Sequence, residues 1–153
     1  MIDLRLSDHF DLEEFGVVPP ECVYPYTKLC EVLLEPLRVH YNQPIIITSG
    51  YRSPAENLAA HGVAHSQHEA TAMYCAADFY IPSMQADLRP VFDLIRGSAG
   101  LQFDQVLLEH GEVGDIIHVS WSRAFNRREA LEGETANRSA YVQFPSAPQA
   151  PEG

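Results

Sequence analysis

Hydrophobic residues recur at helical spacing in three parts of the chain. In residues 26–41 they repeat every four positions, which predicts a helix with one buried side, at Leu29, Leu33 and Leu37. Pro36 falls inside this pattern, so the helix should lose a backbone hydrogen bond or bend there. A second helix is predicted over residues 53–62, because a Ser-Pro pair opens it and a glycine ends it. A third is predicted over residues 83–95, where a serine caps a segment with one apolar side.

Other segments carry the patterns of β-strands. Residues 44–48 are rich in β-branched side chains, which predicts a buried strand. Residues 75–81 predict a second strand, in which alternation places Asp78 on the face opposite the apolar side chains of Cys75, Ala77, Phe79 and Ile81. Residues 103–109 and 115–121 predict a hairpin, because two glycines lie in the short segment between them.

The order of these elements predicts the fold class. Helices come early and the strands mostly pair locally, which indicates an α+β fold with a small antiparallel sheet and helices packed on one side. Residues 127–131 are expected to form a last short helix. We expect residues 1–144 to form a single domain and residues 145–153, rich in proline and alanine, to be a disordered tail.

Composition and charge narrow the range of partners. The 153 residues include 46% hydrophobic and 20% charged residues, an ordinary globular balance. The net charge of −11 disfavours nucleic acid and anionic membranes as partners, because phosphate binding depends on clustered Lys and Arg. The three cysteines form no CxxC pair, which points to a reducing compartment. With no leader pattern and no 18-residue apolar stretch, we expect synthesis in the cytoplasm without a signal peptide and no membrane span.

Three side chains in separate segments form a candidate metal site: His68, Asp78 and His118. Taken singly, each histidine suits a structural role, and Asp78 suits hydrogen bonding to nearby backbone amides. Taken together, they offer three N and O ligands, which leave one position of a tetrahedral zinc ion free for water. A carboxylate in an apolar strand is costly to bury unless it is paired or binds a cation, which favours this interpretation.

A series of short motifs follows in order along the chain. They are Leu6-Ser7-Asp8-His9-Phe10, Leu34-Glu35-Pro36-Leu37-Arg38, Ser49-Gly50-Tyr51-Arg52-Ser53 with Asn57, Ser66-Gln67-His68, Ala76-Ala77-Asp78, Phe103-Asp104-Gln105 and Ile117-His118-Val119-Ser120. Over roughly residues 5–131 the chain thereby resembles the M15 zinc peptidases of the bacterial cell wall, which include D-Ala-D-Ala carboxypeptidases and phage L-alanyl-D-glutamate endopeptidases. The motifs are most similar to those of the phage and prophage branch of this family. The resemblance implies a fold like that of Hedgehog domains and DD-peptidases.

The resemblance also implies roles for individual residues. His68, Asp78 and His118 would hold Zn²⁺, whose bound water becomes a nucleophile near neutral pH. Asp115, three residues before the last histidine, occupies the place of the family's general base, and Glu109 is a second candidate. The substrate-binding residues would be Arg52, Tyr51 and Ser66. The planar guanidinium of Arg52 would bind a peptide carboxylate or an oxyanion, and Arg52 would also have a catalytic role.

One departure from the family pattern concerns the metal site. Asp78 follows His68 by ten residues instead of seven, and the glycine of the family's turn is absent. Two hypotheses follow. The first is a monomeric zinc metallopeptidase, an endolysin-like endopeptidase or a carboxypeptidase, which cuts peptidoglycan stem peptides and reaches the wall after release. The second is a non-catalytic cell-wall-binding or phage structural module on the same scaffold. A third interpretation, a buried polar cluster in a plain globular domain, leaves the ordered motifs unexplained.

Overall fold

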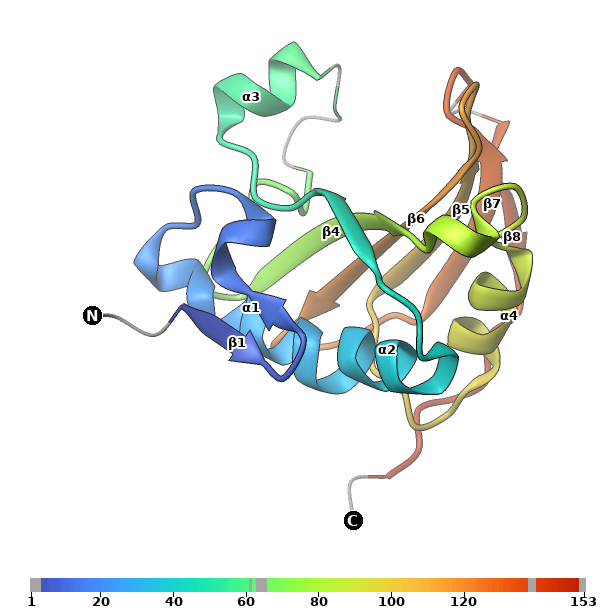
Figure 1. Cartoon of the computed structure of the whole chain (residues 1–153), viewed down its shortest axis with the longest axis horizontal. Coiled ribbons are helices and arrows are strands. Elements are labelled where there is room, and N and C mark those ends of the chain that lie inside the picture. Colours follow the sequence, from blue (N-terminus) through green and yellow to red (C-terminus); the bar gives the residue numbers. More distant parts are fainter. Residues whose placement is uncertain (1–3, 61, 63–65, 138–139, 152–153) are drawn as a thin grey trace.

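The computed structural model describes residues 4–60, 62, 66–137 and 140–151. Its centre is a six-stranded sheet with the strand order β3-β4-β6-β5-β7-β8 (Figure 1). The strands are β3 (Ile46–Ser49), β4 (Tyr74–Tyr80), β5 (Gln105–His110), β6 (Asp115–Ser122), β7 (Glu129–Glu134) and β8 (Val142–Phe144). All neighbours pair antiparallel except β5 and β7, which run parallel. A separate two-stranded ribbon of β1 (Arg5–Ser7) and β2 (Phe10–Asp11) lies near the N-terminus.

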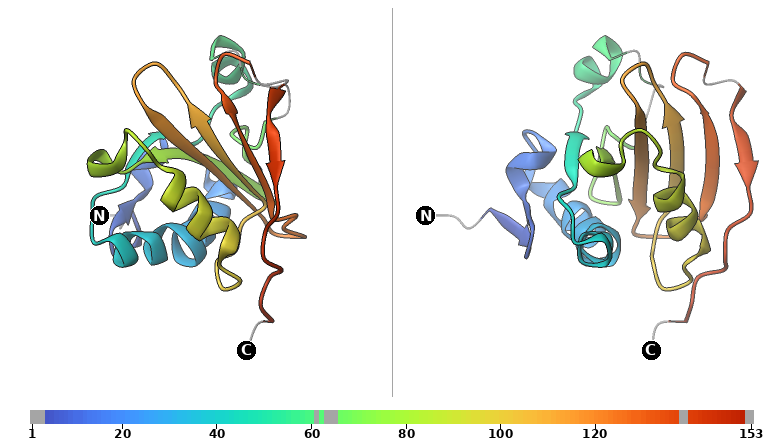
Figure 2. Two further views of the ribbon diagram at one scale, coloured as in Figure 1. Left: turned by 90° about the vertical axis from the view of Figure 1, so that its right-hand side faces the viewer. Right: turned by 45° about the vertical axis from the view of Figure 1, so that its right-hand side comes forward.

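Helices cover one face of this sheet. The long N-terminal helix, made of α1 (Val23–Leu29), η3 (Cys30–Leu34) and α2 (Glu35–Tyr41), lies below the sheet in Figure 1, and α4 (Arg89–Gly97) packs beside β5. Short 3-10 helices connect these elements: η1 (Leu12–Phe15), η2 (Pro20–Cys22) and η4 (Pro82–Met84). The helix α3 (Pro54–Ala59) stands at the end of β3, away from α1 and α2 (Figures 1 and 2). The predicted α+β class with helices on one side of a sheet is therefore confirmed.

Strand register separates a core face from an open face. Ala77 pairs with Val119, and Phe79 with Ile117, and all four are fully buried toward the helices. The alternate positions, where Asp78 pairs with His118, point to the opposite face. The alternation predicted for residues 75–81 is confirmed, and it frees one face of the sheet for polar chemistry.

The N-terminal helix accommodates Pro36 by a local change of helix type. The segment before the proline is a π-helical turn, closed by a bond from the Glu35 amide to the Cys30 carbonyl. Proline has no N–H to offer the carbonyl of Val32, and this carbonyl accepts the amide of Gln102 at 3.4 Å instead. The predicted loss of a helical hydrogen bond is thus compensated from another segment.

Three expectations about local structure are wrong. The strand expected to be buried, β3, is an edge strand on which Ile46 is exposed. Residues 127–131 do not form a helix, because β7 pairs with the edge of β5 and buries Ala130 completely. The gain from sheet pairing and burial overrides the helix propensity of this segment. The helix predicted from residue 83 begins only at Arg89, after η4.

Residues 145–151, expected to be disordered, lie against α4 and the turn that follows it. The amide of Ala147 donates to the Arg96 carbonyl, and the Arg128 guanidinium donates to the carbonyls of Ala147, Leu101 and Ser98. A buried arginine needs hydrogen-bond acceptors, and the tail provides one of them to Arg128. Residues 152–153 lie outside the described part of the chain. Among the described residues, no helix combines the length and apolar character needed to cross a membrane.

Candidate metal centre and cavity

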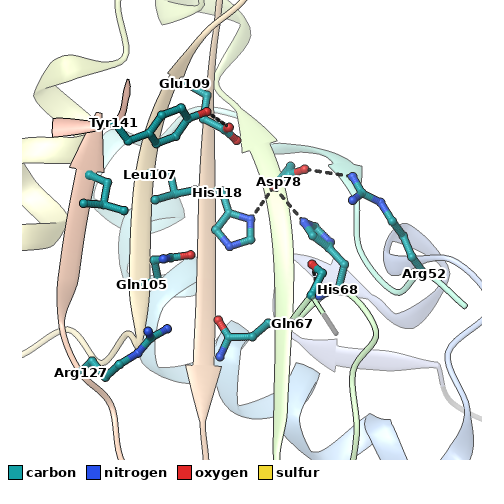
Figure 3. A pocket seen from close by; sticks show the side chains of 12 residues that line it. Arg52, Gln67, His68, Asp78, Gln105, Leu107, Glu109, His118, Arg127 and Tyr141 are labelled. Atoms are coloured by element: carbon teal, nitrogen blue, oxygen red, sulfur yellow. Dashed lines mark hydrogen bonds and ion pairs between the residues drawn. The ribbon is translucent and has the colours of Figure 1, made fainter. Parts of the chain in front are cut away.

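The three predicted metal ligands meet on the open face of the sheet. Asp78 on β4 and His118 on β6 are register partners, so their side chains emerge side by side. His68 comes from the loop before β4 and points at the same spot (Figure 3). One ligand atom from each residue lies within 4.8 Å of the others. Residues separated by up to 50 positions in the sequence thus converge.

The distances fit a divalent metal ion. Asp78 Oδ1 lies 2.9 Å from His118 Nδ1 and 3.2 Å from His68 Nε2. Zinc bonds of about 2.0–2.2 Å in a tetrahedron set neighbouring ligand atoms about 3.3–3.6 Å apart, so these two distances need to change by only a few tenths of an ångström. The other ring nitrogen of His68, Nδ1, lies 2.7 Å from the Gly50 carbonyl oxygen, to which it donates. In the neutral ring this bond keeps the proton on Nδ1, so that Nε2 can exchange its contact with Asp78 for a bond to a metal, and it fixes the plane of the ring.

The Asp78 carboxylate is ionised in this environment. Burial acts to raise the pKa of Asp78, but hydrogen bonds from His118 and His68 outweigh it and hold the pKa well below its usual range. Its second oxygen, Oδ2, lies 3.5 Å from the guanidinium of Arg52. The side chain is therefore an anion prepared to accept a cation.

The long segment between His68 and Asp78 does not separate the ligands. Its extra residues form a loop closed by a bond from the Thr71 amide to the Tyr74 carbonyl. The Ala70 carbonyl accepts from the Cys22 thiol, and the Glu69 carboxylate accepts from the Asn57 side chain at 2.7 Å. The loop is thus held against the N-terminal part of the chain and α3, while β4 keeps Asp78 in register with His118.

A cavity of about 370 Å³ opens in front of the cluster. Its lining is mixed, with two arginines, two carboxylates, amides and two leucines (Figure 3). The residues are Arg52, Ser66, Gln67, His68, Asp78, Gln105, Leu107, Glu109, His118, Arg127, Leu131 and Tyr141. A concave site with a few convergent polar groups is the usual form of a small-molecule or peptide site.

Arg52 and Ser66, two of the substrate-binding residues expected from the sequence, line this cavity, and Tyr51 does not. Arg52 is oriented by Nε, which donates to Ser49 Oγ at 3.1 Å, and by its amide, which donates to the His68 carbonyl. The Ser66 hydroxyl accepts the amide of His68 at 3.2 Å. Tyr51 borders a separate shallow depression next to η1.

The structure does not bring Asp115 to the cavity. Three positions along a regular strand reverse the side-chain direction, so Asp115 points to the helix face when His118 points to the open face. Its carboxylate accepts the Leu88 amide at 2.9 Å and lies 2.6 Å from His110 Nδ1.

Glu109, the second candidate, does line the cavity. Leu107 is the register partner of His118, and Glu109 follows two positions later on the same face. Its side chain is 6% exposed and accepts a hydrogen bond from the Tyr141 hydroxyl. The register of β5 against β6, which the sequence leaves open, therefore places Glu109 on the cavity face.

Sequence reasoning missed several residues of the cavity. Tyr141 lies next to β8, and Arg127 lies before β7, strands that the sequence analysis did not place in the sheet. The motif Phe103-Asp104-Gln105 was a partial signal, because buried Asp104 binds both Arg127 and Gln67.

An α+β fold with a His–Asp–His cluster at the base of an open cavity has the architecture of a metal-dependent hydrolase. A family model described as Peptidase M15 matches residues 9–119, a span that includes all three residues of the cluster. The chain belongs to the M15 peptidases, and its fold agrees with a DD-peptidase-like architecture. No individual curated protein matches the chain.

Proposed function

We propose that the chain is a zinc-dependent peptidase that hydrolyses a peptide bond in the stem peptide of bacterial peptidoglycan. The observation that carries this proposal is the convergence of His68, Asp78 and His118 at the floor of a cavity that also exposes Glu109. Family membership supports the reaction class, and the mixed nitrogen and oxygen donors suit zinc. The identity of the metal, the substrate and the bond are the parts that experiment must test.

His68 Nε2, Asp78 Oδ1 and His118 Nδ1 would hold the ion. When bound, zinc supplies an activated water near neutral pH and polarises the scissile carbonyl. The hydrogen bond from His68 to the Gly50 carbonyl and the strand pairing of Asp78 with His118 fix the three ligands before the metal arrives.

Glu109 is the general base in this proposal. It shares the cavity face with His118, whereas the carboxylate of Asp115 is bound to Leu88 and His110 on the other face. Glu109 takes a proton from the attacking water and passes it to the leaving amine nitrogen. The Tyr141 hydroxyl, which donates to Glu109, orients the carboxylate for this transfer.

Arg52 binds the substrate beside the metal cluster. Its guanidinium is 18% exposed, contacts Asp78 Oδ2, and is anchored by Ser49 and Asn57. A fixed guanidinium suits a peptide carboxylate or the oxyanion that develops on the scissile carbonyl. Arg52 lines the same cavity as the metal ligands.

The cavity favours an endopeptidase over a carboxypeptidase. It is lined on both sides of the metal cluster, by Arg52 on one side and by Leu107 on the other. Substrate residues on both sides of the scissile bond would therefore find contacts. We propose an endolysin-like enzyme of the phage or prophage type that acts as a monomer on the wall after release.

A second candidate function is a non-catalytic wall-binding or phage structural module. The ten-residue spacing of His68 and Asp78 favours it, because it departs from the family's turn. This candidate predicts binding to peptidoglycan without turnover, whether zinc is present or not.

Metal analysis combined with digestion of purified muropeptides tests the proposal. Purified protein should carry about one zinc per chain, release peptide products, and lose activity with a chelator. His118→Ala should lose both metal and turnover, while His40→Ala, an exposed histidine on α2, should keep both. Turnover that persists without metal, or a zinc-loaded protein that cuts no muropeptide, contradicts the proposal.

A further inference from the structure

A second arginine lies in the cavity on the opposite side of the metal cluster from Arg52. In Figure 3, Arg127 and Arg52 flank the cluster, and Gln105 lies between Arg127 and His118. The chain as a whole carries a net charge of −11, so two arginines in one small cavity are a local exception. Their placement suggests that the cavity receives negative groups at two separated points.

The guanidinium of Arg127 is held in place from behind. Nε donates to Asp104 Oδ1 at 3.1 Å, and Nη2 donates to Oδ2 at 2.9 Å, which is a bidentate pair. The Arg127 amide donates to the same carboxylate at 2.8 Å. Asp104 is 3% exposed and also accepts from Gln67 Nε2 at 2.8 Å, so the anchor itself is fixed.

The other edge of the Arg127 guanidinium remains available. Within the described part of the chain, the nearest carboxylate to Nη1 is Glu129 Oε1 at 3.9 Å, beyond a hydrogen bond. That oxygen already accepts from Gln105 Nε2 at 2.6 Å. The side chain of Arg127 is 50% exposed, and it lines the cavity. An anchored guanidinium with free donors needs little reorganisation to bind a carboxylate.

The cavity surface next to Gln105 is partly apolar. Leu107 and Leu131, register partners on β5 and β7, line the cavity level with His118, one step beyond Gln105 from Arg127. This combination suits a substrate residue with an aliphatic stem and a terminal carboxylate, because the stem covers leucine and the anion reaches the guanidinium.

We propose that Arg127 is a second carboxylate-binding residue, and that the substrate is an acidic peptide with a carboxylate on each side of the scissile bond. This inference rests on the proposed peptidase function and narrows its substrate class. Asp104 acts as a positioning residue, which presents the guanidinium of Arg127 to the cavity.

The test compares stem peptides in which each side-chain or terminal carboxylate is singly converted to the amide. With wild-type protein, amidation of the group that meets Arg127 should lower kcat/KM by about ten- to hundredfold, mainly through KM, as expected for a hydrogen bond to a charged group. Arg127→Gln should lower kcat/KM for the acid by a similar factor and leave the amide nearly unchanged. Arg127→Lys should fall between, because it keeps the charge and loses the fork.

The control is Arg123→Gln, an exposed arginine that stacks on Tyr24 outside the cavity, and it should alter neither substrate. Melting temperatures of all variants check folding. Equal losses for acid and amide in Arg127→Gln, or no preference in wild type, overturn the inference. Binding of both peptides to the zinc-loaded Glu109→Gln protein, with and without Arg127→Gln, gives the same comparison without turnover. If wild type cuts nothing, the proposed function fails, while this binding difference still decides on Arg127.

Discussion

Replacing Glu109 by glutamine and Asp115 by asparagine, one at a time, separates the two candidates for the general base. Both carboxylates are almost fully buried, but they lie on opposite faces of the sheet. A general base contributes about 10²–10⁴-fold to the rate, or about 3–5 kcal/mol of the barrier, so Glu109→Gln should lower kcat by that factor. Glutamine keeps an acceptor for the Tyr141 hydroxyl, so the fold should be little affected.

Asp115→Asn should show the opposite profile. The carboxylate accepts the Leu88 amide at the start of α4 and pairs with His110, so loss of its charge should cost about 1.5–3 kcal/mol of stability. Because this contact lies on the helix face, kcat and zinc content should stay within about twofold of wild type in folded protein.

The assay is steady-state hydrolysis of a muropeptide, with zinc content and urea denaturation measured on the same samples. Full kcat in Glu109→Gln, together with a hundredfold loss in Asp115→Asn at unchanged zinc content, would refute the assignment. It would show that the end of β6 rearranges to bring Asp115 to the cavity.

Three further predictions concern stability. Hydrogen bonding to Glu132 raises the pKa of His110 above its ordinary value, so its stabilisation is present below about pH 6.5 and is lost as pH rises through the raised pKa. The unfolding free energy that His110→Gln removes should thus shrink from pH 6 to pH 9 in urea titrations. Gly50→Ala would place Cβ 2.6 Å from the backbone of η1 and should cost about 1–3 kcal/mol, with weaker zinc binding by calorimetry. Tyr26→Phe removes the donor to the Ala76 carbonyl and should lower the unfolding free energy by about 1–3 kcal/mol, seen as a lower Tm.

Local sequence patterns were enough to find most of the scaffold. The alternation in residues 75–81 placed Asp78 opposite the core, and β4 has that arrangement. The hairpin of β5 and β6 followed from two apolar runs joined by glycines. These patterns are reliable because side-chain direction on a strand depends on backbone geometry that neighbouring residues share. The proline in the long helix was also informative, since it lacks the N–H that helical bonding needs.

Residues 127–144 are the part in which local signals failed. Arg127 to Leu131 carry helix-forming residues, yet β7, which begins at Glu129 within this stretch, pairs in parallel with the free edge of β5. Formation of this strand depends on pairing with β5, which is distant in sequence, so local propensities do not predict it. The same pairing of β7 with β5 brings Arg127 and Leu131 to the cavity.

The sequence by itself identified His68, Asp78 and His118 as candidate metal ligands, because their residue types and motifs can be recognised one segment at a time. The tertiary structure decided which carboxylate lines the same cavity. Asp115 faces the helices because it lies three residues before His118 on the same strand. Glu109 faces the cavity because β5 and β6 pair with Leu107 opposite His118, and a shift of one residue would turn it to the helix face. Register is fixed by burial across the whole sheet, so it becomes visible only when all the strands are in place.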